Sequence, residues 1–155
     1  MKKKLFLGVA FFLIAAFSSL SWGQSPGYGL YSGWPTYLGF QFQAGNLRLG
    51  AGLSGYGLGG DMGLILARTR LPAGPGVDLA WYYGAGVGAG FWTVFSYTGF
   101  YVFPHGLAGV EYKLPGMAVS AYAELNLGVG IGLGALMSWR SIAPDFAGRV
   151  GVIFR

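Results

Sequence analysis

Cysteine is absent from this chain of 155 residues, histidine occurs once, and charged side chains make up only 10% of the residues. The lack of cysteine excludes a disulfide framework, a thiolate metal site and a catalytic thiol. Soluble domains normally contain about 25% charged residues, so the low charge is not typical of a protein surrounded by water. Together with 54% hydrophobic residues, it indicates a chain whose solvent is lipid.

Long apolar helices are also missing after the N-terminal segment. The apolar stretch at residues 125–137 contains Asn126 and alternating glycines, and it is shorter than the roughly 20 residues that a membrane-spanning helix needs. The 30 glycines have no three-residue period, which excludes a collagen-like chain. The many aromatic residues exclude a disordered one.

The first 23 residues are predicted to be a secretory signal peptide. They comprise a basic region at Lys2–Lys4, an apolar region at Leu5–Phe17 and a small-x-small cleavage site at residues 21–23. An uncleaved anchor is the alternative, but the apolar region is short for a span. Removing the three lysines would leave residues 24–155 with 7 Lys+Arg against 5 Asp+Glu, a net charge of +2 instead of +5. We therefore expect no nucleic-acid partner.

Alternation of apolar with small or polar residues dominates the remaining chain. From residue 77 to 91 the apolar side chains share one parity, a two-residue period that indicates a strand with one oily face. Similar alternation predicts further strands at residues 38–44, 47–53, 62–71, 106–114, 117–131 and 146–154. Turn residues at 45–46, 72–76 and 115–116 predict hairpins, and longer connections are expected at 54–61, 92–100 and 132–145.

An eighth strand is predicted at residues 28–34, where the alternation is weak, because an open sheet edge in lipid would leave backbone groups unpaired. The predicted fold class is all-β: an eight-stranded antiparallel up-and-down transmembrane β-barrel, or meander. A soluble barrel with its oily faces inward is disfavoured, because Gly, Gln and Tyr with few charges would form its surface. Arg68 and Arg70 share the parity of Leu64 and Leu66, a conflict that a β-bulge would resolve.

Together, the predicted signal peptide, the alternation, the strand count and a last strand ending in Phe154 resemble the small eight-stranded outer-membrane barrels. The transmembrane domain of OmpA, OmpX and OmpW are examples. The segment GLAGVEYKLPGMAVSAYAELNLGVGIG is also similar to a hairpin that recurs in this class. The resemblance implies a monomer in the outer membrane of a Gram-negative-type envelope, surrounded by outer-membrane lipid. It also implies delivery by the outer-membrane insertion machinery, with Phe154 as the C-terminal signal. Typical members end on the aromatic residue, whereas Arg155 follows here.

The charged residues gather on the face opposite the oily one and are predicted to line the lumen. This polar set comprises Arg48, Asp78, Glu111, Lys113, Glu124 and Arg149. Because charges inside a narrow barrel need partners, we expect Glu111, Glu124 and Arg149 to form a cluster that plugs the lower lumen. The predicted function is a structural, membrane-integrity role with a mostly plugged lumen. A porin-like, gated ion path is the alternative.

Glycines and aromatic residues support a further alternative function. Five inward glycines either line a small cavity or relieve crowding beneath larger side chains: Gly84, Gly86, Gly88, Gly128 and Gly130. An interfacial aromatic girdle is predicted from Phe91, Trp92, Phe95, Tyr97, Phe100, Tyr101 and Phe103. The alternative is a small transporter or binder of apolar molecules that uses the glycine-lined cavity and the aromatic segment.

Motifs for catalysis, cofactor binding or metal binding are not found in the sequence. We therefore expect no enzyme activity, no cofactor and no metal. A lipid-modifying outer-membrane enzyme is the least favoured alternative, and its candidate residues would be His105, Ser96 and Asp145.

Overall fold

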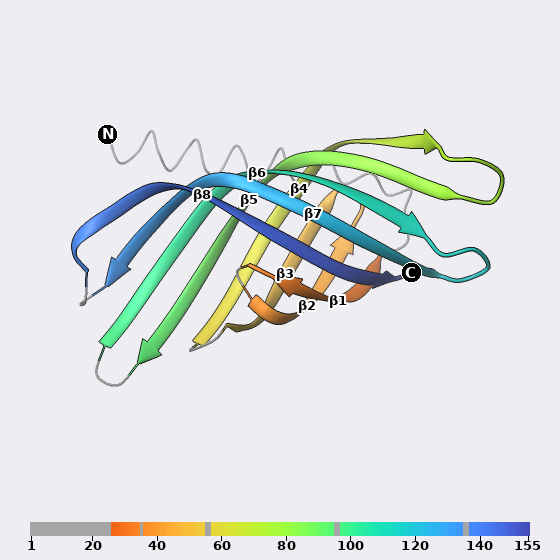
Figure 1. Cartoon of the computed structure of the whole chain (residues 1–155). Coiled ribbons are helices and arrows are strands. Elements are labelled where there is room, and N and C mark those ends of the chain that lie inside the picture. The colour runs from red at the N-terminus through yellow and green to blue at the C-terminus, as the bar shows by residue number, and fades with distance from the viewer. Residues whose placement is uncertain (1–25, 35, 55–56, 95–96, 135–136) are drawn as a thin grey trace.

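The computed structural model describes residues 26–34, 36–54, 57–94, 97–134 and 137–155. Over these residues the chain is all-β, and eight antiparallel strands close into one barrel in sequence order (Figure 1). The strands are β1 (Gly27–Gly33), β2 (Thr36–Ala44), β3 (Leu47–Ser54), β4 (Gly57–Pro72), β5 (Asp78–Val94), β6 (Tyr97–Lys113), β7 (Val119–Gly134) and β8 (Met137–Phe154). The predicted all-β, eight-stranded antiparallel barrel is confirmed. None of the described segments forms a helix with the length and hydropathy required to cross a membrane.

The two faces of each strand differ as the alternation predicts. On β5, Trp81 and Val87 lie on the outside and are exposed, whereas Tyr82 and Gly88 lie inside and are buried. All five acidic residues of the chain occupy inward positions in the strand register: Asp61, Asp78, Glu111, Glu124 and Asp145. Among strand residues whose side chains the structure describes, no charged residue is on the outward register. The oily faces therefore point away from the barrel axis.

The barrel is narrow, with its strands staggered around the axis. Following the pairing from Leu30 around all eight strands reaches Ile142 on β8, ten residues before Val152, which pairs with Leu30 directly. A stagger of this kind requires strands that are tilted from the barrel axis by about 35–45°. Eight strands leave an interior just wide enough to be filled by side chains.

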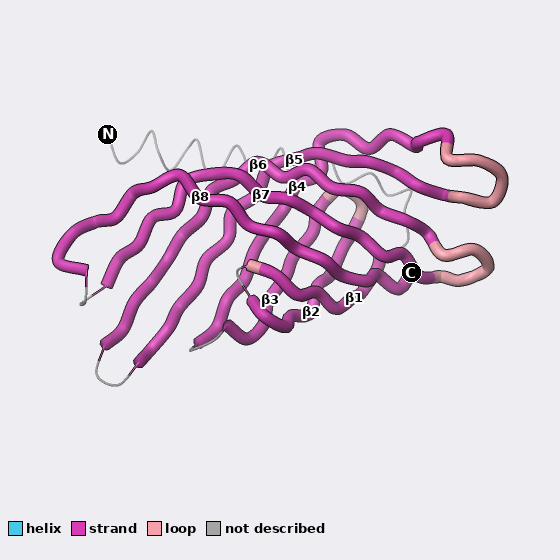
Figure 2. Tube along the Cα trace, viewed as in Figure 1, coloured by secondary structure: helices cyan, strands magenta, loops and turns pink. Residues whose placement is uncertain are grey.

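The three predicted hairpin turns are present, at residues 45–46, 73–77 and 114–118 (Figure 2). Gly45 has a φ of 56°, a left-handed conformation that glycine adopts without the steric cost of a Cβ. The weakly patterned first strand is also confirmed, because β1 pairs with both β2 and β8 and thereby closes the barrel.

The long connections that the sequence predicts at 54–61, 92–100 and 132–145 are wrong. β4 begins at Gly57, β6 at Tyr97 and β8 at Met137, so these segments are largely strand. Glycine-rich stretches continue the ladder there, as in the pairing of Gly59 with Gly90. The backbone of glycine pairs as well as any other, but its lack of a side chain hides the alternation.

A β-bulge at Leu66 determines which face of β4 carries Arg68 and Arg70. Ile65 and Ala67 pair with the consecutive residues Gly84 and Tyr83, so Leu66 is an extra residue on β4. The inserted residue reverses the parity of the rest of the strand. Arg68 consequently lies opposite the inward-facing Tyr82, which resolves the conflict in the sequence pattern.

Candidate functional site: the filled interior of the barrel

A buried ion pair lies at the centre of the barrel. Arg48 Nη1 on β3 donates a hydrogen bond of 2.6 Å to Glu124 Oε2 on β7, and the two side chains are 2% and 0% exposed. Tyr82 Oη donates to the same carboxylate oxygen at 3.0 Å. The Arg48 guanidinium also lies 4.6 Å from the ring centroid of Tyr122, within cation–π range. Each buried charge therefore has a partner, without which its desolvation would be costly.

A second ion pair adjoins the first. Arg149 on β8 makes a two-point contact with Asp61 on β4, of which the Nη1–Oδ2 hydrogen bond is 2.7 Å. Paired, parallel hydrogen bonds of this type are among the stronger polar contacts in proteins. Arg149 Nη1 is also 3.8 Å from Glu124 Oε1, which joins the two pairs. The Arg149 guanidinium lies 3.9 Å from the ring centroid of Tyr31 on β1.

We refer to Arg48, Asp61, Glu124 and Arg149, together with Tyr31, Tyr82, Tyr122 and Gln41, as the central network. Tyr122 Oη donates a hydrogen bond of 2.6 Å to Gln41 Oε1, which extends the network to β2. Its members come from seven of the eight strands, β6 being the exception. Two arginines balance two carboxylates, so the centre of the lumen is occupied by a neutral cluster of linked side chains.

The predicted cluster of Glu111, Glu124 and Arg149 is only partly present. Glu124 and Arg149 are in contact, but Glu111 lies apart and pairs with two other arginines. Its Oε2 is 2.8 Å from Arg68 Nη2, and its Oε1 is 2.7 Å from Arg155 Nη1. The bulge that turns Arg68 inward supplies this different partner, and Arg155, directly after β8, supplies the other.

The predicted polar set of the lumen therefore divides into two groups. Arg48, Glu124 and Arg149 belong to the central network, whereas Asp78, Glu111 and Lys113 lie toward the end with the 73–77 and 114–118 turns. Asp61 is not among the residues predicted to line the lumen, because residues 54–61 are predicted to be a connection. The signal that could have found Asp61 is its parity with Gly59 and Gly63, which places it on the inward face of an extended β4.

The residues predicted to form the aromatic girdle do not share one face of the barrel. Phe91 and Phe100 pair directly across β5 and β6 and face outward, 46% and 43% exposed. Tyr101 and Phe103 have the opposite parity and face the lumen, where Phe103 is fully buried. The assignment of these two residues to the outer girdle is wrong, because successive residues of a strand face opposite sides.

The remaining members of the predicted girdle are divided between the lumen and the undescribed parts of the chain. Trp92 is on the inward register and lies over Gly99 of β6. Phe95 lies outside the described residues, and for Tyr97 the structure describes the strand backbone only.

Inward aromatic residues form an aromatic cap, which we define as Trp34, Tyr101, Phe103 and His105. Trp34, after β1, reaches Tyr101 on β6 with ring centroids 4.8 Å apart in an edge-to-face arrangement. Phe103 lies between Tyr101 and His105, and it stacks on the His105 ring at 4.7 Å. The cap lies farther along the lumen than the central network, toward the end opposite the 114–118 turn. The lumen is thus filled at two levels.

Two of the glycines proposed to line a cavity, Gly86 and Gly130, lie beneath these side chains. A Cβ on Gly86 would be 2.8 Å from His105 Nε2, and one on Gly130 would meet the Tyr101 hydroxyl. On Gly84 and Gly128 a Cβ would meet backbone atoms of the adjacent strands, and Gly88 is buried. The geometry agrees with glycines that make room for large inward side chains in a narrow barrel.

Two of the candidate catalytic residues, His105 and Asp145, contact different partners. Asp145 accepts a hydrogen bond from Tyr101 Oη, whereas His105 Nδ1 lies 2.8 Å from the carbonyl oxygen of Phe103. Ser96 lies outside the described residues. In the segments that the structure describes, no group of three or more Asp, Glu and His residues could hold a metal ion.

No family model, curated protein or solved structure matches this chain. The class of the protein therefore follows from its fold and interior alone. It is a closed eight-stranded antiparallel barrel with an apolar outer face and a polar interior filled by side chains.

Proposed function

We propose that the chain is an integral outer-membrane β-barrel protein with a structural, membrane-integrity role and a closed lumen. The observation that carries the proposal is the apolar outer face. Large apolar side chains are exposed there on several strands, including Phe40, Leu125 and Phe146 at 75%, 71% and 80%. Monomeric soluble proteins rarely expose a continuous apolar surface of more than a few hundred Å². Lipid would cover this surface.

The lengths of β4–β8 support the same proposal. These strands contain 16 to 18 residues, more than the roughly 9–11 that a tilted strand needs to cross a bilayer. β1–β3 contain 7 to 9 residues, at or below that number, so the wall of the barrel is lower on their side. Over the height of β1–β3 the closed barrel gives each strand a neighbour on both sides, as backbone groups in lipid require.

The filled interior supports a structural role over a pore. Ions would have to pass both the central network and the aromatic cap, and both consist of side chains in direct contact. In this proposal the partners are outer-membrane lipid and the outer-membrane insertion machinery, the protein is a monomer, and Phe154 belongs to the insertion signal. The proposed signal peptide, residues 1–23, lies outside the described residues.

The experiment uses residues 24–155 refolded in detergent and in lipid vesicles. We expect a compact species that resists proteinase and migrates differently after boiling, and we expect no conductance in planar bilayers. Solubility in plain buffer without detergent would contradict the membrane assignment. Stepwise conductance by the compact species would instead contradict the closed lumen and favour the gated path.

A further inference from the structure

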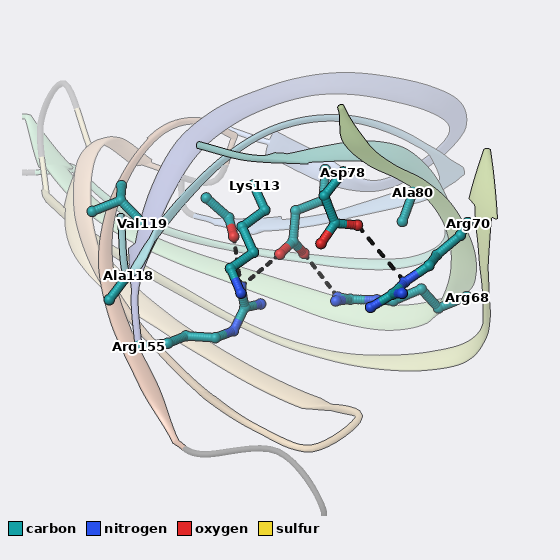
Figure 3. Close-up of a pocket in the computed structure, with 10 residues that line it drawn as sticks. Arg68, Arg70, Asp78, Ala80, Lys113, Ala118, Val119 and Arg155 are labelled. Atoms are coloured by element: carbon teal, nitrogen blue, oxygen red, sulfur yellow. Dashed lines mark hydrogen bonds and ion pairs between the residues drawn. The ribbon is translucent and has the colours of Figure 1, made fainter. Parts of the chain in front are cut away.

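A cavity of about 430 Å³ opens at the end of the barrel that carries the 73–77 and 114–118 turns. We call it the basic vestibule (Figure 3). Its lining comprises Arg68, Arg70, Asp78, Ala80, Glu111, Lys113, Ala118, Val119, Ser120 and Arg155. Its volume is within the range of about 300–1,000 Å³ that is typical of small-molecule sites. Six of these ten residues are charged, so the cavity is suited to a charged or polar ligand rather than an apolar one.

Positive charge is in excess in the basic vestibule. Four cationic side chains line it against two side-chain carboxylates, Asp78 and Glu111. Glu111, whose side chain is 5% exposed, is shared between Arg68 and Arg155, so one negative charge faces two guanidinium groups. Arg155 Nη2 is buried and has no hydrogen-bond partner among the described residues. The central network, with two arginines and two carboxylates, is neutral by comparison.

Arg68 and Arg155 are held within the wall of the vestibule, whereas Arg70 and Lys113 are exposed at its mouth. The bulge at Leu66 turns Arg68 and Arg70 of β4 toward the cavity. Arg155 is held from the opposite side by hydrogen bonds of 2.7 Å to both Glu111 Oε1 and Ser120 Oγ (Figure 3). The guanidinium groups of Arg68 and Arg155 are therefore both held by Glu111 before any ligand arrives, which lowers the entropic cost of binding.

The vestibule is also accessible from the side. β3 begins at Leu47, which pairs with Leu64, so β4 beyond the bulge has no β3 partner among the described residues. The β4–β5 and β6–β7 hairpins project together past this point, at the right of Figure 1. A ligand can therefore reach the arginines without passing through the barrel.

We propose that the basic vestibule binds an oxyanion of the phosphate class, either free phosphate or the phosphate of a lipid headgroup. Guanidinium groups provide paired N–H donors that match phosphate oxygens. The unpartnered Arg155 Nη2 provides a donor of this type, and Arg70 and Lys113 add charge at the mouth. A bound phosphate would offset the positive charge that Asp78 and Glu111 do not neutralise. This inference requires only the folded barrel, so it stands or fails independently of the membrane role.

The test is a phosphorus NMR titration of the refolded barrel in a maltoside detergent. One arm uses inorganic phosphate and the other uses dihexanoyl phosphatidic acid, both at fixed ionic strength with chloride as the competing anion. We expect saturable changes in shift and line width. Tighter binding of inorganic phosphate identifies a site for a soluble anion, and tighter binding of dihexanoyl phosphatidic acid identifies a headgroup site. No saturable binding in either arm overturns the proposal.

Charge variants make the test specific to the vestibule. Lys113→Gln removes a cation at the mouth and should weaken binding about tenfold, the loss expected for one charge-assisted hydrogen bond. Asp78→Asn removes an anion and should strengthen binding. Arg155→Gln should weaken binding at least as much as Lys113→Gln. The shift on boiling establishes that each variant is folded. If the folded Lys113→Gln and Asp78→Asn variants bind like the unmodified protein, the proposal is overturned.

Discussion

Arg48 on β3 and Glu124 on β7 are 76 residues apart in the chain, yet they form an ion pair of 2.6 Å in the barrel interior. Removing two charges from water costs about as much as their attraction returns, so such a pair adds little net stability. Removing only one partner is different, because it leaves an uncompensated buried charge. Each buried arginine in the interior therefore needs a buried carboxylate, and this requirement can be tested by removing one partner.

Glu124→Gln should destabilise the barrel by about 3–5 kcal/mol, because it leaves Arg48 without a counter-charge. The measurement is the free energy of unfolding from denaturant titration in detergent, followed by tryptophan fluorescence. Asp78→Asn is the matched control. The partner of Asp78 is Arg70, 3.7 Å away and 85% exposed, so the loss should stay below about 1 kcal/mol. Equal losses for the two variants would contradict a central network that depends on charge pairing.

Closure of the lumen at two levels predicts that neither level alone controls conductance. Replacing Trp34 and Tyr101 by alanine removes the contact that spans the aromatic cap, and the central network should still block ions. Replacing Arg48 and Glu124 by serine in addition should open a path, because both obstacles in series are then weakened. Planar-bilayer recordings of the two variants test this prediction. Conductance by the cap variant alone would mean that the central network does not close the lumen.

Strand faces and barrel closure could be predicted from the sequence because they depend on local alternation. The long run at residues 77–91 places Trp81 outside and Tyr82 inside, as the structure has them. The weak first strand could be predicted because a barrel in lipid cannot leave an edge open. Both arguments need only the two-residue period and the cost of unpaired backbone groups.

The partners inside the lumen could not be predicted in the same way. Contacts between side chains depend on the stagger between strands and on single inserted residues. The alternation of apolar and polar residues predicts neither. Asp61 was missed because the glycines around it hide the pattern, although it pairs with Arg149. Glu111 was given the wrong partners because the bulge at Leu66, suggested only by the parity of Arg68, could not be placed from the sequence.

Exchanging Ala67 with Arg68 tests whether the inward placement that the bulge gives Arg68 matters. Ala67 pairs with the outward-facing Tyr83, so the double variant Ala67→Arg, Arg68→Ala moves the arginine to the outer face. Arginine on the lipid face costs up to about 2–4 kcal/mol at mid-depth, so the yield of the proteinase-resistant species should fall in vesicles. Deleting Leu66 is the control, because it removes only the extra residue and leaves Arg68 opposite Tyr82 on the inward register. Equal yields for the exchange variant and the Leu66 deletion would mean that the inward placement of Arg68 is not required.

Gly39→Ala tests whether inward glycines make room for aromatic rings. A Cβ at Gly39 would lie 2.5 Å from Tyr31 Cε1 and 2.6 Å from its Cζ, so the ring would have to shift. Overpacking of this kind typically costs about 1–3 kcal/mol. A Cβ at Gly148 would have no atom within 4 Å, so Gly148→Ala should be close to neutral. Unfolding free energies of the two variants, measured side by side in detergent, provide the comparison.

Leu127→Arg separates a membrane barrel from a water-soluble one. Leu127 on β7 is 71% exposed on the outer face, and Met117, in the turn before β7, is 57% exposed. In water, substitutions at exposed sites usually change stability by no more than about 0.5 kcal/mol, so both arginine variants should be nearly neutral. In lipid, arginine near mid-depth costs about 2–4 kcal/mol, falling to about 0–1 near the interface. We therefore expect a large loss for Leu127→Arg and a small one for Met117→Arg.

The measurement is the unfolding free energy of each variant in lipid vesicles, extended along β7 by single arginine substitutions at other outward positions such as Ala121, Ala123 and Val129. If lipid surrounds the barrel, the cost of arginine should rise to a maximum in the middle of the strand and fall toward both ends, because the charge reaches water more easily there. The distance between the two low-cost ends would give the thickness of the apolar belt. A flat profile along β7 would mean that the outer face meets water or another protein, and the membrane assignment would then have to be abandoned even though the barrel itself is folded.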